Sequence, residues 1–121
     1  MNEKRMEDAM TIILHAGDAR LYCNKALKAI SKSDITLAKE NLKEAQKKIT
    51  AAHRVQTDAI QAETRGEHAE YSMLFAHAQD TLMTIYSEIN IAKQLIKVFG
   101  TIEQRLTALE GGRGCDDEQR T

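Results

Sequence analysis

Three long stretches of the chain place apolar or small residues at alternating steps of three and four, and no proline interrupts them. This spacing keeps the residues on one side of an α-helix and is typical of helices that pack as coiled coils. The pattern predicts an all-α fold. The three stripes are Met6, Ala9, Ile13, Ala16, Arg20, Cys23, Leu27 and Ile30; Ile35, Ala38, Leu42, Ala45, Ile49 and Ala52; and Ala78, Leu82, Ile85, Ile89, Ala92, Ile96 and Phe99.

Two breaks separate the stripes. Ser33 and Asp34 carry side-chain oxygens that can cap the start of a helix, so one of them is predicted as the N-cap of the second helix. Gly66 suits the left-handed position that follows a helix C-terminus. The predicted helices cover residues 3–31, 34–64 and 68–109.

Short connections make consecutive helices antiparallel, so the chain is predicted to form an up-down-up three-helix bundle. Residues 1–109 form the predicted domain. Residues 110–121 include Gly111-Gly112-Arg113-Gly114 and are predicted to be a disordered polar tail.

Charge and composition exclude several functions. The 17 basic and 18 acidic residues give a net charge of −1, which provides no electrostatic basis for binding nucleic acid or an anionic membrane. The charged start is unlike a signal peptide, and apolar runs such as residues 11–14 are too short to span a bilayer. We therefore expect a cytoplasmic protein. Cys23 is expected to pack in the core and Cys115 to lie in the tail, without a disulfide.

The third helix carries more apolar residues than one stripe can use. A three-helix bundle buries one stripe per helix, so the surplus favours self-association, although a monomer with an unusually apolar surface is the alternative. With aromatic residues at only 4%, a monomer would also have a thin core. The surplus residues are Met73, Leu74, Phe75, Met83, Ile91, Leu95 and Val98.

His77 is the main candidate for chemistry. It lies in a polar cluster within an apolar stretch, and helical geometry places Asp80 about 60° from it on the helix surface. Met73 and Leu74 cover the adjoining turn. The pattern allows a packed histidine, a metal ligand or a nucleophile. Imidazole titrates near neutrality, so its nitrogen can accept a phosphoryl group and pass it on.

The other histidines are weaker candidates. His15 has Asp18 one turn later, which could orient it, but a structural role is favoured for His15 and His53. His68 is expected to be solvated. No histidine follows a glutamate by three positions, which removes the signature of a carboxylate-bridged metal bundle. The charged segment 39–48 is interpreted as a solvated helix face.

Three blocks of the sequence nevertheless occur together, in order, in a known family. They are Ile12-Ile-Leu-His-Ala-Gly-Asp-Ala-Arg20, Ala51-Ala-His-Arg-Val-Gln-Thr57 and Ala76-His-Ala-Gln-Asp-Thr-Leu-Met-Thr84. Over residues 6–100 the chain resembles the enzyme IIA components of the lactose/cellobiose (chitobiose) class of the bacterial sugar phosphotransferase system.

The resemblance implies a homotrimer of three-helix bundles. It also implies that His77 accepts a phosphoryl group on Nε2 from the phosphocarrier protein HPr and passes it to a cysteine of enzyme IIB. Asp80 and its two symmetry mates would hold a divalent cation, with Mg²⁺ expected, because converging carboxylates repel until a hard cation neutralises them. The sugar would be of the lactose, cellobiose or chitobiose type.

The chain departs from the family pattern in two places that bear on function. Thr81 stands where many members have a second histidine, and residues 101–121 extend beyond the length expected. Two other function classes remain open. One is a helical adaptor or coiled-coil scaffold without chemistry, and the other is a metal-binding bundle that uses both His77 and Asp80 as ligands.

Overall fold

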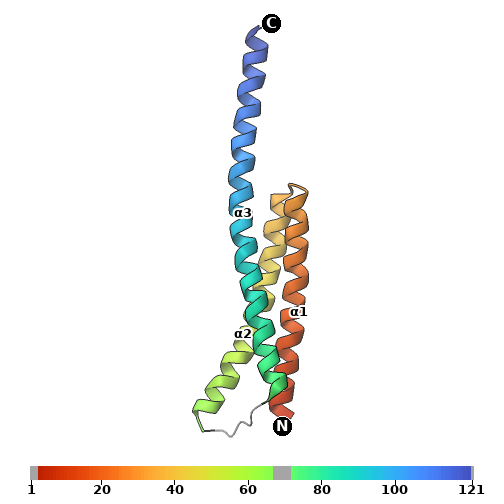
Figure 1. Cartoon of the computed structure of the whole chain (residues 1–121), viewed down its shortest axis with the longest axis vertical. Coiled ribbons are helices and arrows are strands. Elements are labelled where there is room, and N and C mark those ends of the chain that lie inside the picture. The colour runs from red at the N-terminus through yellow and green to blue at the C-terminus, as the bar shows by residue number, and fades with distance from the viewer. Residues whose placement is uncertain (1–2, 67–71, 121) are drawn as a thin grey trace.

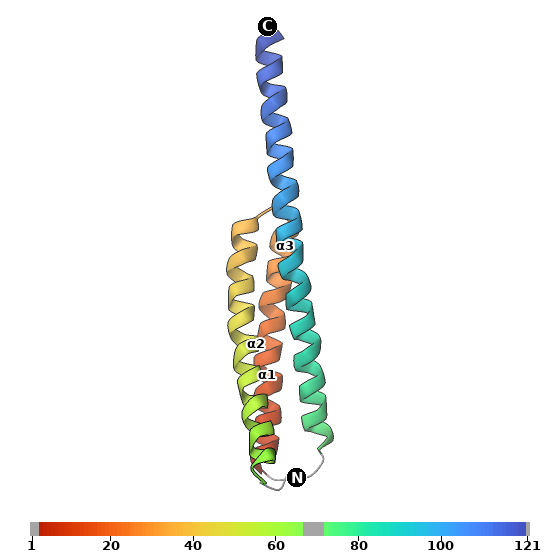
Figure 2. The same ribbon diagram turned by 90° about the vertical axis from the view of Figure 1, so that its left-hand side faces the viewer.

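The computed structural model describes residues 3–66 and 72–120, with side chains up to residue 111. Three helices follow one another, α1 (Glu3–Ser31), α2 (Ile35–Thr64) and α3 (Met73–Arg120). They run up, down and up, and α3 continues far beyond the end of the other two (Figure 1). A view at right angles shows the three helices running lengthwise beside one another, with α1 between α2 and α3 (Figure 2). The predicted all-α, up-down-up bundle is confirmed.

The turn between α1 and α2 is built by two adjacent residues, Ser33 and Asp34. The Asp34 and Ser33 amides donate to the carbonyls of Ala29 and Ile30, both at 2.9 Å, which satisfies the open end of α1. Ser33 adopts a positive φ of 61° to make this possible. Asp34 then caps α2, because its side chain accepts a hydrogen bond from the Leu37 amide at 3.1 Å. Of the two predicted N-caps, Asp34 is the one used.

Replacing Asp34 with alanine is expected to lower the free energy of unfolding by about 1 kcal/mol, because the Leu37 amide loses its acceptor. Thermal and urea denaturation followed by circular dichroism measure this change. Ser33→Gly in the same turn is a matched control of opposite sign, since glycine adopts the positive φ without steric cost. Equal stability of Asp34→Ala and the parent chain would contradict the capping role.

The start of α3 differs from the prediction. The helix begins at Met73 rather than near residue 68, and residues 67–71 lie outside the described part of the chain. The buried Ser72 hydroxyl accepts a hydrogen bond from the Phe75 amide at 3.1 Å, which caps the first turn. Gly66 has a φ of 87° after α2, as expected for a left-handed residue at this position.

The core is dominated by alanine. Of the 21 buried hydrophobic residues in the described part of the chain, eleven are alanines and Phe75 alone is aromatic. Small side chains let helix axes approach closely, so the bundle closes with little aromatic bulk. The stripes predicted for α2 and α3 are confirmed, except that Ile35 is only partly buried and Phe99 is exposed.

The stripe predicted for α1 is partly wrong. Met6, Arg20 and Leu27 are exposed, whereas Ile12, Ala19 and Ala26 take their places in the core. Two apolar stripes overlap on this helix, and the one richer in alanine is the one buried in the core. Phe75, predicted to lie off the core stripe of α3, is also buried.

The far end of α3 has no neighbour within the described chain. The helix continues to Arg120, past the predicted end at residue 109, so the segment that was expected to be a disordered tail is helical. Residues 101–111 are all exposed, and they lie on the part of α3 that projects beyond α1 and α2 (Figure 1). The division into a domain at 1–109 and a tail at 110–121 stays a prediction. Within the described residues, no helix has the length and hydrophobicity needed to cross a bilayer.

Candidate functional site

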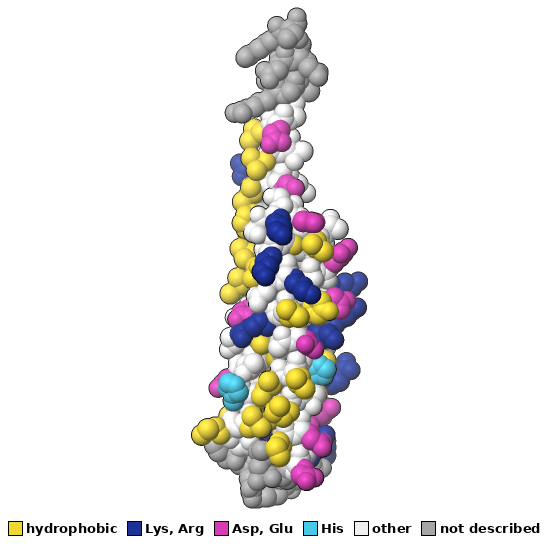
Figure 3. Space-filling view, turned by 90° about the vertical axis from the view of Figure 1, so that its right-hand side faces the viewer, with side chains coloured by type: hydrophobic (Ala, Val, Ile, Leu, Met, Phe, Trp, Pro, Cys, Tyr) yellow, Lys and Arg dark blue, Asp and Glu magenta, His cyan; other side chains and the backbone are white. Residues whose placement is uncertain are grey.

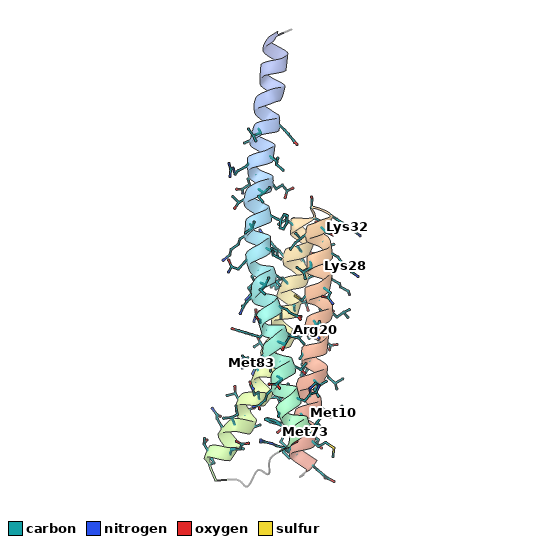
Figure 4. All side chains as sticks on the ribbon, in the orientation of Figure 1. Met10, Arg20, Lys28, Lys32, Met73 and Met83 are labelled. Carbon is teal, nitrogen blue, oxygen red and sulfur yellow. The ribbon has the colours of Figure 1, made fainter. Side chains whose placement is uncertain are left out.

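His77 lies on the second turn of α3, with its side chain exposed. Met73, one turn earlier on the same side, is 78% exposed and projects from the base of the helix (Figure 4). Leu74 is half-buried and packs against the core. The Thr81 hydroxyl donates to the His77 carbonyl at 2.8 Å, so Thr81 bonds the backbone of the preceding turn. An accessible imidazole beside an exposed apolar side chain suits contact with another protein.

The start of α3 is anchored from both other helices. The Arg5 guanidinium of α1 stacks over the Phe75 ring, 3.9 Å from its centroid, and forms an ion pair with Glu63 of α2. Phe75 itself is buried only two residues before His77. These contacts hold the backbone that carries His77, while the His77 side chain stays free to meet a partner.

Asp80 is exposed and faces a shallow hollow of about 540 Å³ on one side of α3. Within the part of the chain that has side chains, no cationic group forms an ion pair with it. The hollow thus presents one uncompensated carboxylate with hydroxyl groups beside it. The lining residues are Asp80, Met83, Thr84, Ser87, Glu88 and Ile91.

Glu88, which shares this hollow, is already paired. Arg20 of α1 donates to both its carboxylate oxygens, from Nε at 3.1 Å and from a terminal nitrogen at 2.8 Å. The hydrogen bond to Glu88 raises the pKa of Arg20 above its usual value. Figure 4 shows Arg20 between α1 and α3. This ion pair was not predicted from the sequence. The signal that could have indicated it is Arg20 itself, a single arginine within the apolar stripe of α1.

His15 and His53 have no arrangement for chemistry among the described residues. The His53 ring meets the Tyr86 ring edge-on, with centroids 5.8 Å apart, which joins α2 to α3. His15 is half-buried, and among the described residues its Nδ1 has no hydrogen-bond partner, so Asp18 does not orient it. His68 lies outside the described residues. Exposure and position therefore distinguish His77 from His15 and His53.

Cys23 is a buried, free thiol, as the sequence predicted. Burial raises its pKa, with a smaller contribution in the same direction from Glu88. The folded chain therefore holds the thiol proton at a pH where the unfolded chain has lost it. Stability from this group is complete below about pH 9 and is lost as the pH rises through the folded pKa.

We expect urea denaturation to show a fall in unfolding free energy above about pH 9 that is smaller in Cys23→Ala. Other groups titrate in this range, so the measured quantity is the difference between the two pH profiles. Cys115→Ser is the matched control because it keeps the buried thiol. Parallel profiles for the parent chain and Cys23→Ala would show that this thiol does not couple to folding.

The charged face of α2 is exposed, as predicted. Lys39, Lys43 and Lys47 form one wall of an open groove of about 890 Å³, and Lys93 and Lys97 of α3 form the other. The groove contains no carboxylate or imidazole to supply acid–base chemistry. Among the described side chains of a single chain, no group of three or more histidine, cysteine or acidic residues could hold a metal ion.

Sequence comparison gives a match that covers most of this architecture. Residues 7–100 match the family described as "PTS system, Lactose/Cellobiose specific IIA subunit". The lichenan-specific phosphotransferase enzyme IIA component of Bacillus subtilis is 36% identical over 106 residues, which cover 87% of this chain and 96% of the relative. The lactose-specific EIIA component of Staphylococcus epidermidis is 36% identical over 88 residues, covering 73% and 85%.

Structure comparison agrees. The crystal structure of the PTS cellobiose-specific enzyme IIA from Bacillus anthracis superposes with a TM-score of 0.79 at 33% identity, covering 86% of this chain and 95% of that one. The family match ends at residue 100, whereas α3 continues to Arg120. The three helices and the His77 region therefore lie inside the shared part, and the projecting end of α3 lies outside it.

Proposed function

We propose that this chain, which belongs to the lactose/cellobiose-specific IIA family of the sugar phosphotransferase system, carries a phosphoryl group on His77. In this proposal His77 receives the group from HPr and gives it to a cysteine of the cognate enzyme IIB. The transfer supports uptake of a disaccharide of the lactose, cellobiose or chitobiose type. The observation that carries the proposal is the exposed imidazole of His77 on a firmly anchored helix.

The transfer needs a nucleophile and correct positioning, with little further chemistry from the protein. The Nε2 lone pair of neutral His77 attacks phosphorus, and the bond from phosphorus to the HPr histidine breaks as the new one forms. In the second step a thiolate of enzyme IIB attacks the same phosphorus, and the His77–phosphorus bond breaks. The exposed Met73 beside His77 offers an apolar contact for both partners.

We further propose that the functional unit is a homotrimer with Asp80 at its threefold axis. Sixteen large hydrophobic residues are exposed among the described residues of the single chain, which is a large surplus for a monomer of this size. Those on the outer side of α3 include Met83, Ile91 and Val98. Burying this side against two further copies would remove much of the surplus from water.

The residues around Asp80 fit a hard divalent cation such as Mg²⁺, held once by the three chains together. Each chain supplies one exposed carboxylate that has no cationic partner among the described side chains, with the hydroxyls of Thr84 and Ser87 in the same hollow. Oxygen donors of this kind are the ligands that Mg²⁺ binds. The cation would neutralise the three carboxylates, so its role is structural, and the phosphoryl transfer itself depends on His77.

A reconstituted relay tests the proposed function. The full chain is incubated with phosphoenolpyruvate, enzyme I and HPr, and its intact mass is measured before and after a cognate enzyme IIB is added. Before enzyme IIB is added, we expect the chain to gain one phosphoryl group that is labile in acid and stable in alkali, as a phosphohistidine is. After enzyme IIB is added, we expect the chain to lose this group to enzyme IIB. A chain that gains no phosphoryl group while a known enzyme IIA does so in the same mixture would refute the proposal.

A further inference from the structure

The end of α3 carries an apolar stripe that nothing in the described part of the chain covers. Phe99, Ile102, Leu106 and Leu109 are between 43 and 66% exposed, and they follow the half-buried Leu95. Figure 3 shows hydrophobic side chains gathered along one side of the projecting helix. All of this stripe except Phe99 lies beyond residue 100, where the family match ends. Its partner must therefore be sought outside the three-helix bundle.

The spacing of this stripe is that of a coiled coil. Successive steps of four and three place Leu95, Ile102 and Leu109 at d positions and Phe99 and Leu106 at a positions of the heptad. The outward positions hold small or polar residues, namely Gly100, Thr101, Gln104, Thr107, Ala108 and Gly111. A single helix of this length is marginal in water without packing of its apolar side. The pattern indicates association with similar helices.

The charges beside the stripe favour copies of this chain in parallel. Arg105 occupies a g position, and Glu110 occupies the following e position, which is the pairing made between neighbouring parallel helices in register. An antiparallel arrangement would instead place Arg105 against Arg105, and glutamates against one another. The segment is thus self-complementary in one orientation.

The stripe also continues the face of α3 that carries Asp80. Asp80, Ile91 and Ile102 are each about three helical turns apart, so they lie on nearly the same side of the helix. Ile91 lines the Asp80 hollow and is 59% exposed. If Asp80 faces a threefold axis, the apolar stripe on each of the three projecting helices faces that axis as well.

We propose that residues 99–109 form a parallel, in-register, three-stranded coiled coil with the same segment of two further copies of this chain. This inference rests on the proposed trimer and adds to it a second contact, above the bundle, that residues 7–100 alone lack. The coiled coil would hold the three bundles together independently of the cation at Asp80.

Charge exchange tests the register. The concentration at which half of the trimer dissociates is measured by sedimentation equilibrium for the full chain, for Arg105→Glu, for Glu110→Arg and for the double exchange. Each single variant places like charges opposite each other at three contacts, so we expect it to dissociate at a concentration about 10-fold higher or more. The double exchange should restore the parent value. Unchanged values in a trimeric chain would overturn the coiled coil.

Cysteine cross-linking tests the orientation independently. In a Cys115→Ser background, Ile102→Cys should form disulfide-linked pairs of chains upon mild oxidation, because equivalent d positions adjoin in a parallel coil. Thr107→Cys, on the outward side, is the control and should not. A trimer in which neither or both cross-link would overturn the in-register arrangement, whereas a monomeric parent chain would overturn the proposed trimer as well.

Discussion

Replacing His77 by glutamine is expected to reduce phosphoryl incorporation from HPr to below about one hundredth of the parent level, because the amide has no nucleophilic nitrogen. Glutamine keeps the length and polarity of the side chain, and His77 is exposed, so folding should be unaffected. The measurement is acid-labile label per chain in the reconstituted relay, with helicity and thermal midpoint measured on the same sample.

Two matched variants control for a general effect of removing histidine. His15→Gln and His53→Gln change residues of α1 and α2 that are half-buried, and we expect both variants to retain most of the labelling. His53→Gln also loses the ring contact with Tyr86, so a small drop in stability without loss of labelling is the expected pattern. Full labelling of His77→Gln would show that another residue accepts the phosphoryl group and would refute the assignment to His77.

The helices were predictable because local signals and tertiary packing agree along most of the chain. Asp34 can cap a helix whatever surrounds it, and Gly66 can adopt a positive φ at low cost, so both boundaries of α2 followed from residue type. The start of α3 was less predictable. Ser72 is a common cap residue, but the polar segment before it offered several alternative starts.

The core face of α1 could not be read from spacing alone. Periodicity favoured Ile13 and Leu27, whereas the bundle buries Ile12, Ala19 and Ala26. Which of two overlapping stripes is buried depends on the distance between helices, which is a tertiary property. Spacing alone also cannot identify the partner of Arg20, because Glu88 is distant in sequence and lies beside Arg20 only when α1 and α3 pack together.

The candidate site was predicted from residue order, yet its character depends on exposure. A helical histidine with a carboxylate one turn later is compatible with packing, metal binding or nucleophilic chemistry. The structure leaves His77 and Asp80 both exposed, on an α3 start that Arg5 and Phe75 hold in place. What a single chain cannot supply is the set of ligands for a cation, because Asp80 contributes one carboxylate.

Removal of divalent cations is expected to weaken the trimer of the parent chain but not that of Asp80→Asn. Without a cation, three carboxylates near the axis repel one another, and two like charges 4 Å apart in a partly buried environment cost on the order of 4 kcal/mol. We expect EDTA to raise the concentration for half-dissociation at least about 10-fold in the parent chain. Asparagine keeps the shape of the side chain and removes the charge, so EDTA should not change the concentration for half-dissociation of the Asp80→Asn trimer.

The neighbouring carboxylate provides the matched control. Glu88 lines the same hollow but is paired with Arg20, so Glu88→Gln should keep the parent response to EDTA. His77→Gln should keep it too, because the proposed cation binds oxygen ligands at the axis. Loss of the response in His77→Gln would instead identify a histidine–carboxylate metal site. A parent trimer that is indifferent to EDTA, with no divalent cation in its purified form, would exclude the proposed role of Asp80 and leave packing along α3 as the basis of assembly.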